Sequence, residues 1–261
     1  MKVTILGAGT AIPAREHSPS GVYVQAGREH LLLDAGPGTL QRLHAAGVPW
    51  QELDRIFLTH FHLDHCLDLA SILFALRIPR PAGHDSRGGP QVERRKSLTV
   101  YGPPGLKRFY RRLNAAFQGW LSPRGFPLIL KELREAKLKL NGYTVHSHPV
   151  NHYDTGAIGY RLEEAGKRLA YSGDTDVCEA VAELGRNVHL LILECSLPDA
   201  RKAEGHLTPS ECGQLADAAN CRHLVLTHFY PVFKGYDIRR RVRRFFRGRV
   251  TLARDFTSFT L

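Results

Sequence analysis

The sequence lacks the long apolar runs of membrane proteins and secreted precursors. None of its 261 residues belongs to a stretch approaching the roughly 18 to 20 apolar residues that span a bilayer. The first residues, MKVTILGAGTAIP, contain only a four-residue apolar run before the glycines, unlike a signal peptide. The sequence therefore predicts a cytoplasmic protein with no membrane partner.

Cysteine is also scarce, and its spacing shows no paired motif. The five cysteines are odd in number, scattered, and form no CxxC pair. This spacing argues against a disulfide framework and suits a reducing compartment. We expect the five to be small core residues and not metal ligands: Cys66, Cys178, Cys195, Cys212 and Cys221.

No tandem repeat interrupts the chain, and 43% hydrophobic residues suffice for a sizeable core. Short apolar runs of strand length alternate with glycine turns and helical stretches, which predicts a sheet-centred α/β fold. We expect one domain over residues 1–261. Residues 79–96 are rich in proline, glycine and charge and predict an exposed loop.

The net charge is +11, and its excess arginine gathers in two clusters. A larger cluster lies in residues 239–249, where apolar residues at helical spacing predict an amphipathic helix over 236–246. A smaller one lies in residues 107–112. The larger cluster is either a solvated helix face or an RNA-binding face, and the sequence leaves both interpretations open, while the smaller cluster falls in a helix predicted over residues 105–117.

The segment THFHLDH places His60, His62, Asp64 and His65 within six positions. Imidazole and carboxylate donors suit zinc, and one ion cannot easily use all four, so we expect two ions. A structural zinc site is disfavoured because such sites are usually rich in cysteine and only Cys66 is near. A short apolar run precedes the motif, as in a buried strand that delivers a site from its carboxyl end.

Three later apolar runs also end in polar residues, namely Asp174, Glu194 and His228. If these strands lie side by side, their carboxyl ends meet at one sheet edge. A further region holds His146, His148 and His152. Of these we favour His152 as a ligand, because it lies in the turn that precedes a predicted strand.

This ordered set resembles the metallo-β-lactamase superfamily, and most of all its ribonuclease Z branch. The opening LGAGTAIP and the segment LLLDAGPGT are similar to that branch as well, so the resemblance covers nearly the whole chain. It implies a four-layered αββα sandwich with a dinuclear metal site at one edge. Dimers are common in the branch, so the resemblance also makes a homodimer an expectation.

The resemblance implies a role for each residue of the set. The first metal would be bound by His60, His62 and His152, the second by Asp64, His65 and His228, with Asp174 bridging both. Zinc is expected, although manganese or iron would tolerate these ligands.

The catalytic candidates are Asp64, His206 and Glu194. His206, in GHLTP, occupies the place of a histidine that the branch uses as an acid, although Leu207 and Pro209 depart from its pattern. The competing interpretation of this segment is a helix start, with Thr208 as the N-cap.

We expect hydrolysis of a phosphodiester. Members of the branch that process tRNA carry a long arm between the histidine at 152 and the aspartate at 174, and here only 22 positions separate them. The sequence therefore ranks a small-molecule or cyclic phosphodiesterase ahead of a ribonuclease Z-type tRNA 3′-endonuclease. A lactonase, a thioesterase or a non-catalytic RNA-binding relative rank lower.

Overall fold

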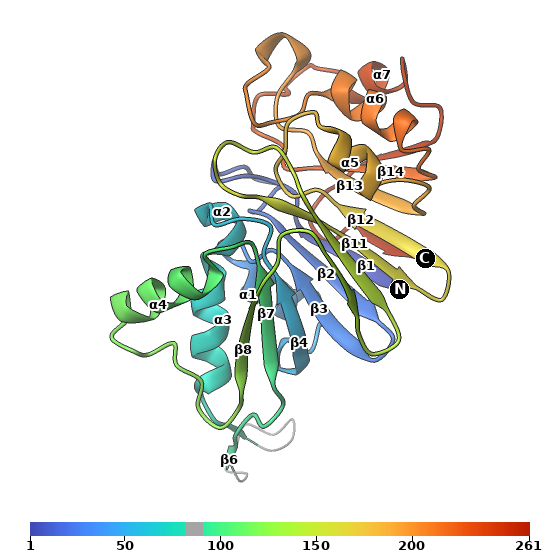
Figure 1. Cartoon of the computed structure of the whole chain (residues 1–261). Coiled ribbons are helices and arrows are strands. Elements are labelled where there is room, and N and C mark those ends of the chain that lie inside the picture. The colour runs from blue at the N-terminus through green and yellow to red at the C-terminus, as the bar shows by residue number, and fades with distance from the viewer. Residues whose placement is uncertain (82–90) are drawn as a thin grey trace.

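Two seven-stranded β-sheets pack face to face in the computed structural model, which describes residues 1–81 and 91–261 (Figure 1). The first sheet has the order β16 (Ser258–Thr260), β1 (Lys2–Gly7), β2 (Gly21–Ala26), β3 (Glu29–Leu33), β4 (Leu53–Phe57), β7 (Leu98–Gly102) and β8 (Leu128–Glu132). The second has the order β15 (Arg249–Leu252), β14 (His223–Thr227), β13 (Leu190–Glu194), β12 (Lys167–Tyr171), β11 (Ile158–Glu164), β10 (Thr144–Pro149) and β9 (Ala136–Lys139).

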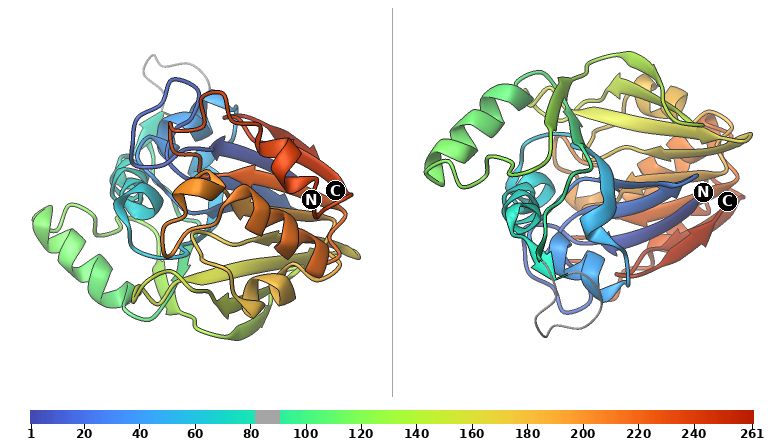
Figure 2. Two further views of the ribbon diagram at one scale, coloured as in Figure 1. Left: turned by 90° about the horizontal axis from the view of Figure 1, so that it is seen from above. Right: turned by 90° about the horizontal axis from the view of Figure 1, so that it is seen from below.

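Helices cover the outer face of each sheet (Figures 1 and 2). The first sheet is covered by α1 (Thr39–Ala45), α3 (Asp68–Arg77) and α4 (Leu106–Ala116), and the second by α5 (Glu179–Leu184), α6 (Pro209–Ala218) and α7 (Ile238–Val242). Shorter helical turns are α2 (Leu63–Cys66), η1 (Trp50–Glu52) and η2 (Asp199–Arg201). The predicted αββα sandwich is confirmed. Among the described residues, no helix is both long and apolar enough to cross a bilayer.

Side-chain alternation along the strands builds three layers of core. In β3, Leu31 and Leu33 face the second sheet, whereas Leu32 points outward to the helices. Successive residues of a strand point to opposite faces, so a strand covered on both faces must be apolar throughout. β13, with the sequence LLILE, is buried at every position and ends in Glu194. Its apolar run therefore carries a carboxylate to the end of a buried strand.

Two local predictions differ from the structure. The predicted helix over 236–246 is much shorter, because only Ile238–Val242 is helical and turns follow before the strand at 249. In the predicted loop over 79–96, residues 82–90 lie outside the described residues, while β5 (Arg80–Pro81) pairs with β6 (Gln91–Val92). Arg94 is buried and donates to the carbonyl oxygens of Leu53 and Ser97, whereas the neighbouring Arg95 is exposed, so this end of the segment is only partly exposed.

Candidate metal centre and active site

The candidate residues meet at one edge where strands of both sheets end. β12, β13 and β14 run parallel, and Glu194 pairs in register with Thr227, so their carboxyl ends lie at one level. Asp174 follows β12, Glu194 ends β13, and His228 follows β14. The turn after β4 in the first sheet supplies His60 to the same edge. Ligands commonly bind outside the carboxyl ends of such strands.

The turn after β4 presents its side chains through a change from extended to helical backbone. His62 is extended and stands directly before α2, so Asp64 and His65 belong to the first helical turn. His60 and His65 are fully buried, while His62 is exposed. The motif thus reaches from the protein interior to the solvent-facing rim of the site.

Asp174 lies at the centre of the cluster. Its Oδ1 is 3.1 Å from His65 Nε2, and its Oδ2 is 3.4 Å from His228 Nε2. The same Oδ2 lies 3.9 Å from His152 Nε2 and 4.0 Å from His60 Nε2. Oδ1 therefore faces His65, whereas Oδ2 lies between His228 on one side and His152 and His60 on the other, so the carboxylate is next to both groups of histidines.

All seven residues expected to be ligands lie in this cluster. Their donor atoms form two groups within 4.8 Å: one of His60, His62, His152 and Asp174, the other of Asp64, His65 and His228. His228 Nε2 lies 3.4 Å from Asp64 Oδ2, and His152 Nε2 lies 3.1 Å from His62 Nδ1. His148, the less favoured candidate, lies elsewhere, with its Nδ1 3.9 Å from Glu135.

The donor atoms fit divalent cations. Within the described part of the chain, His60 Nε2 and one oxygen of Asp174 are buried without a hydrogen-bond partner. Such orphaned atoms are costly unless a ligand satisfies them. Burial, followed by the charge of His65, lowers the pKa of His60, so the neutral imidazole that binds metals is favoured. Burial acts to raise the pKa of Asp174, but His228 and His65 outweigh it, so the carboxylate stays ionised.

Asp34, which the sequence analysis missed, orients His65. It is fully buried at the end of β3 and accepts hydrogen bonds from His65 Nδ1 at 2.7 Å and from the Tyr171 hydroxyl at 2.8 Å. The backbone N–H and the hydroxyl of Thr59 donate to it as well, at 2.8 and 2.9 Å. Because Nδ1 is bound to Asp34, Nε2 is the ring nitrogen that faces Asp174 and would be available to a metal ion. Its place after an apolar strand in LLLDAGPGT is the signal that could have found it.

Glu194 and His206 form a second buried pair beside the cluster. His206 Nδ1 lies 3.0 Å from Glu194 Oε1, and the Ser196 hydroxyl donates to Glu194 Oε2 at 2.5 Å. Burial acts to lower the pKa of His206, but the hydrogen bond and charge of Glu194 outweigh it and raise the pKa. Ser196 also contacts His228 Nδ1 at 2.9 Å and so connects the pair to the cluster. Ser196 was not among the residues predicted from the sequence.

The segment around His206 both starts a helix and places His206 at the site, the two interpretations that the sequence suggested. α6 begins at Pro209 with Thr208 as N-cap, and Glu211 accepts from the Thr208 backbone N–H at 2.9 Å. This capping box fixes the helix start and leaves His206, two residues earlier, at the site. The rings of Tyr153 and Tyr230 lie 6.2 and 6.0 Å from the His206 ring, on the rim of the site.

Gly173 is required by close packing between the sheets. Its φ is 61°, and a Cβ there would come within 2.7 Å of the Thr59 side chain. Any other residue would be strained and would push the turn carrying Asp174 away from the turn carrying His60. The glycine thus sets the separation of the two ligand turns.

Comparison with known proteins decides the family. The family model of the β-lactamase superfamily domain matches residues 29–229, most of the chain. The chain belongs to the β-lactamase superfamily. Within that superfamily it is similar to a Ribonuclease Z of Nocardia farcinica, at 28% identity over 100% of this chain and 97% of the relative.

Solved structures of the superfamily agree with this assignment. The metallo-β-lactamase fold protein YhfI from Bacillus subtilis is 24% identical, with a TM-score of 0.81 over 99% of this chain and 98% of that one. Human tRNase Z, short form, is 25% identical, with a TM-score of 0.78 over 100% and 99%. The predicted resemblance to the ribonuclease Z branch is confirmed, and the chain is a metal-dependent hydrolase.

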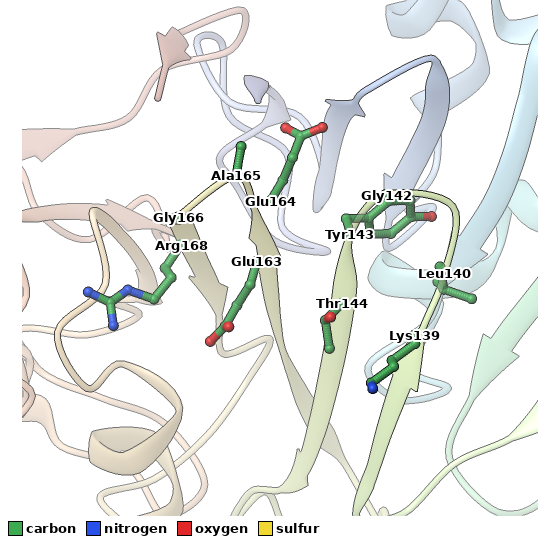
Figure 3. A pocket seen from close by; sticks show the side chains of 10 residues that line it. All are labelled: Lys139, Leu140, Gly142, Tyr143, Thr144, Glu163, Glu164, Ala165, Gly166 and Arg168. Atoms are coloured by element: carbon green, nitrogen blue, oxygen red, sulfur yellow. The ribbon is translucent and has the colours of Figure 1, made fainter.

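A cavity of about 530 Å³ lies away from this superfamily site (Figure 3). It is lined by the turns that join β9 to β10 and β11 to β12, including Tyr143, Glu163 and Arg168. These turns are at the opposite ends of β10 and β12 from the metal cluster. None of the candidate site residues lines the cavity, so its volume has no bearing on the hydrolytic chemistry.

Proposed function

We propose that the chain is a ribonuclease Z-type endonuclease that hydrolyses a phosphodiester bond at the 3′ end of precursor tRNA. The observation that carries the proposal is full-length similarity to proteins named Ribonuclease Z, with every candidate ligand present at one edge. This similarity reverses the ranking from sequence, which put a small-molecule phosphodiesterase first. The alignment with the Nocardia relative covers 316 positions, more than the 261 residues here, so that relative contains insertions.

In this proposal the site holds two divalent ions, most suitably Zn²⁺. His60, His62 and His152 would hold one, Asp64, His65 and His228 the other, and Asp174 would contact both. Neutral imidazoles with carboxylates are donors that zinc prefers, and two separate donor groups around one carboxylate support a count of two. When bound, such ions polarise a phosphoryl oxygen and activate water at neutral pH.

The residues of the chain would orient the substrate and handle the proton. Glu194 holds His206 through Nδ1, so Nε2 is the atom left to give a proton to the departing ribose oxygen. The hydrogen bond and charge of Glu194 raise the pKa of His206, which favours the protonated imidazole. Ser196 and the Leu207 backbone N–H, at 3.1 Å, fix Glu194 in turn. The buried pair therefore fits the role of a positioned general acid.

The test compares substrates on protein of measured metal content. Precursor tRNA with a 3′ trailer, mature tRNA, a cyclic phosphodiester and bis-(para-nitrophenyl) phosphate are assayed beside Asp174→Ala. Cleavage at the trailer junction, absent in the variant, supports the proposal. If the small diesters are hydrolysed while precursor tRNA stays uncleaved, the phosphodiesterase is favoured. The short connection between His152 and Asp174 supports that alternative. RNA binding without turnover on any ester would indicate the non-catalytic relative.

A further inference from the structure

Helix α4 carries an exposed positive stripe whose side chains form no ion pair within the part of the chain that the structure describes. Residues 94–131 contain nine lysines and arginines and no aspartate or glutamate. Within this stretch α4 contributes Lys107, Arg108, Arg111 and Arg112, all four exposed. None of the four side chains makes an ion pair with the described residues. The other cations nearby differ, because Arg94 is buried and Arg95 and Arg124 lie close to Glu93.

The placement of these charges opposes the stability of the helix. Lys107 and Arg108 lie in the first turn, where the helix dipole is positive and acidic residues are favoured. The pairs Lys107 with Arg111 and Arg108 with Arg112 are four residues apart, a spacing at which like charges repel. All four share one side of the helix. These positive charges repel one another and the positive end of the helix in the free protein. Binding of an anionic partner would relieve that repulsion, which explains why the charges are there.

The helix is fixed to the ligand turn at its start. The Phe109 ring stacks on the ring of Phe61 at a centroid distance of 4.8 Å and an angle of 16°. Phe61 lies between His60 and His62 in the metal-ligand turn. Leu106 is buried in the outer core, and Glu132 accepts from the backbone N–H of Lys107 at 3.0 Å. The first-turn cations are therefore held beside the site, while the helix projects outward past α3 (Figures 1 and 2).

We propose that the cationic face of α4 binds the phosphate backbone of the RNA whose scissile bond lies at the metal centre. This inference rests on the proposed function and deepens it by naming where the RNA docks. A phosphate backbone fits the observations because it offers regularly spaced negative charges and needs no apolar groove. The C-terminal arginines are the competing surface. There Arg241 is ion-paired with Asp199 at 4.0 Å, whereas none of the four α4 cations is ion-paired within the described residues.

The experiment measures binding and cleavage separately. The test variant replaces Lys107, Arg108, Arg111 and Arg112 with alanine, a strong helix former, so that the helix is retained. A second variant, Arg108→Lys, Arg111→Lys and Arg112→Lys, keeps the charge. The matched control removes four exposed arginines from the other cluster: Arg239, Arg240, Arg243 and Arg244 to alanine. Binding of fluorescent precursor tRNA is followed by anisotropy in chelator, across a range of salt concentrations.

The alanine variant of α4 is expected to bind roughly 10- to 100-fold more weakly at low salt, with a salt slope smaller by about 3 to 4. Its KM for precursor tRNA rises, whereas turnover of bis-(para-nitrophenyl) phosphate is unchanged. The lysine variant binds like the wild type. Unchanged binding in the α4 variant, or an equal loss in the α7 control, overturns the inference. Failure of the proposed function is a different result, in which the wild type binds RNA through α4 and does not cleave it.

Discussion

Replacing Asp34 with asparagine tests how the second group of ligands is organised. The side chain keeps its size and shape but loses its charge and one acceptor oxygen. Asp34 has a φ of 58°, in the left-handed region where aspartate and asparagine are both well tolerated, so the backbone is not strained. The substitution therefore changes the hydrogen bonds and little else.

The effect on His65 depends on which hydrogen-bond donors around position 34 can change their role. The backbone N–H of Thr59 always donates, so the amide oxygen of the new residue must face it. The amide NH₂ group then faces His65 Nδ1 in place of a carboxylate oxygen. To avoid two opposed donors, His65 must shift its proton to Nε2. A protonated Nε2 cannot bind a metal ion, so the second metal position is the one affected.

The expected magnitude has two parts. Loss of the partner that orients a metal-binding histidine typically weakens metal affinity or activity 10- to 100-fold, or about 1.4 to 2.7 kcal/mol. The buried donors of Tyr171 and Thr59 are also left with poorer partners, which costs about 1 to 3 kcal/mol of folding stability. For a chain of this size each kcal/mol lowers the Tm by about 2 to 4 °C.

The assay measures zinc per chain after dialysis against a weak chelator, together with hydrolysis of bis-(para-nitrophenyl) phosphate. The variant should retain about one ion less than the wild type and recover activity only at higher zinc concentration. Tyr171→Phe is the matched control, because it removes one donor to the same carboxylate and leaves the proton of His65 in place. Wild-type zinc content and turnover in the asparagine variant would refute the reasoning.

Three further predictions test other parts of the site and the fold. Asp174→Ala should lower activity by roughly 10³-fold and reduce bound zinc, since the carboxylate lies beside histidines of both donor groups; full metal content would contradict the bridging role. His206→Gln should lower kcat on RNA by about 10² to 10⁴ but hardly affect bis-(para-nitrophenyl) phosphate, whose leaving group needs no proton; equal losses on both substrates would argue against a general acid. Burial and then Arg249 lower the pKa of His223 from 6.5 to about 4, so the folded state resists protonation that the unfolded chain accepts below 6.5. Stability is thus lost as the pH falls from about 6.5 to 4, by at most about 3 kcal/mol from this residue. Between pH 7 and pH 5, the free energy of unfolding measured in urea should fall less in His223→Gln than in the wild type. The same fall in both proteins would disprove the assignment.

The sequence anticipated the site where ligands follow apolar strands. His60, Asp174 and His228 each come directly after a buried run, and the pattern was enough to expect them at one sheet edge. Asp34 follows a strand in the same way, but its contacts are with His65 and Tyr171, which are remote in sequence. No local pattern shows that pairing. The contact with His65 exists because β3 and β4 are neighbours in the first sheet, and the contact with Tyr171 exists because the two sheets pack face to face.

The arginine-rich segments show what the sequence could not predict. Helical spacing correctly indicated helices in both clusters, yet the helix near the C-terminus covers only Ile238–Val242. Spacing also could not rank the two basic surfaces, because exposure, ion pairs and distance from the site depend on neighbouring elements. The stack of Phe61 on Phe109, which places α4 beside the ligand turn, joins residues 48 positions apart.

The amino-acid sequence by itself indicated a sheet-centred α/β fold, the residues expected to bind metal and the excess of positive charge. These follow from local patterns: apolar alternation in strands, imidazoles gathered in one turn, and arginines at helical spacing. The tertiary structure alone decided which oxygen of Asp174 faces which histidines, how Asp34 fixes the proton of His65, and which basic helix stands next to the site. The physical reason is that hydrogen bonds and metal ligation act over about 3 Å between side chains that only sheet packing brings together.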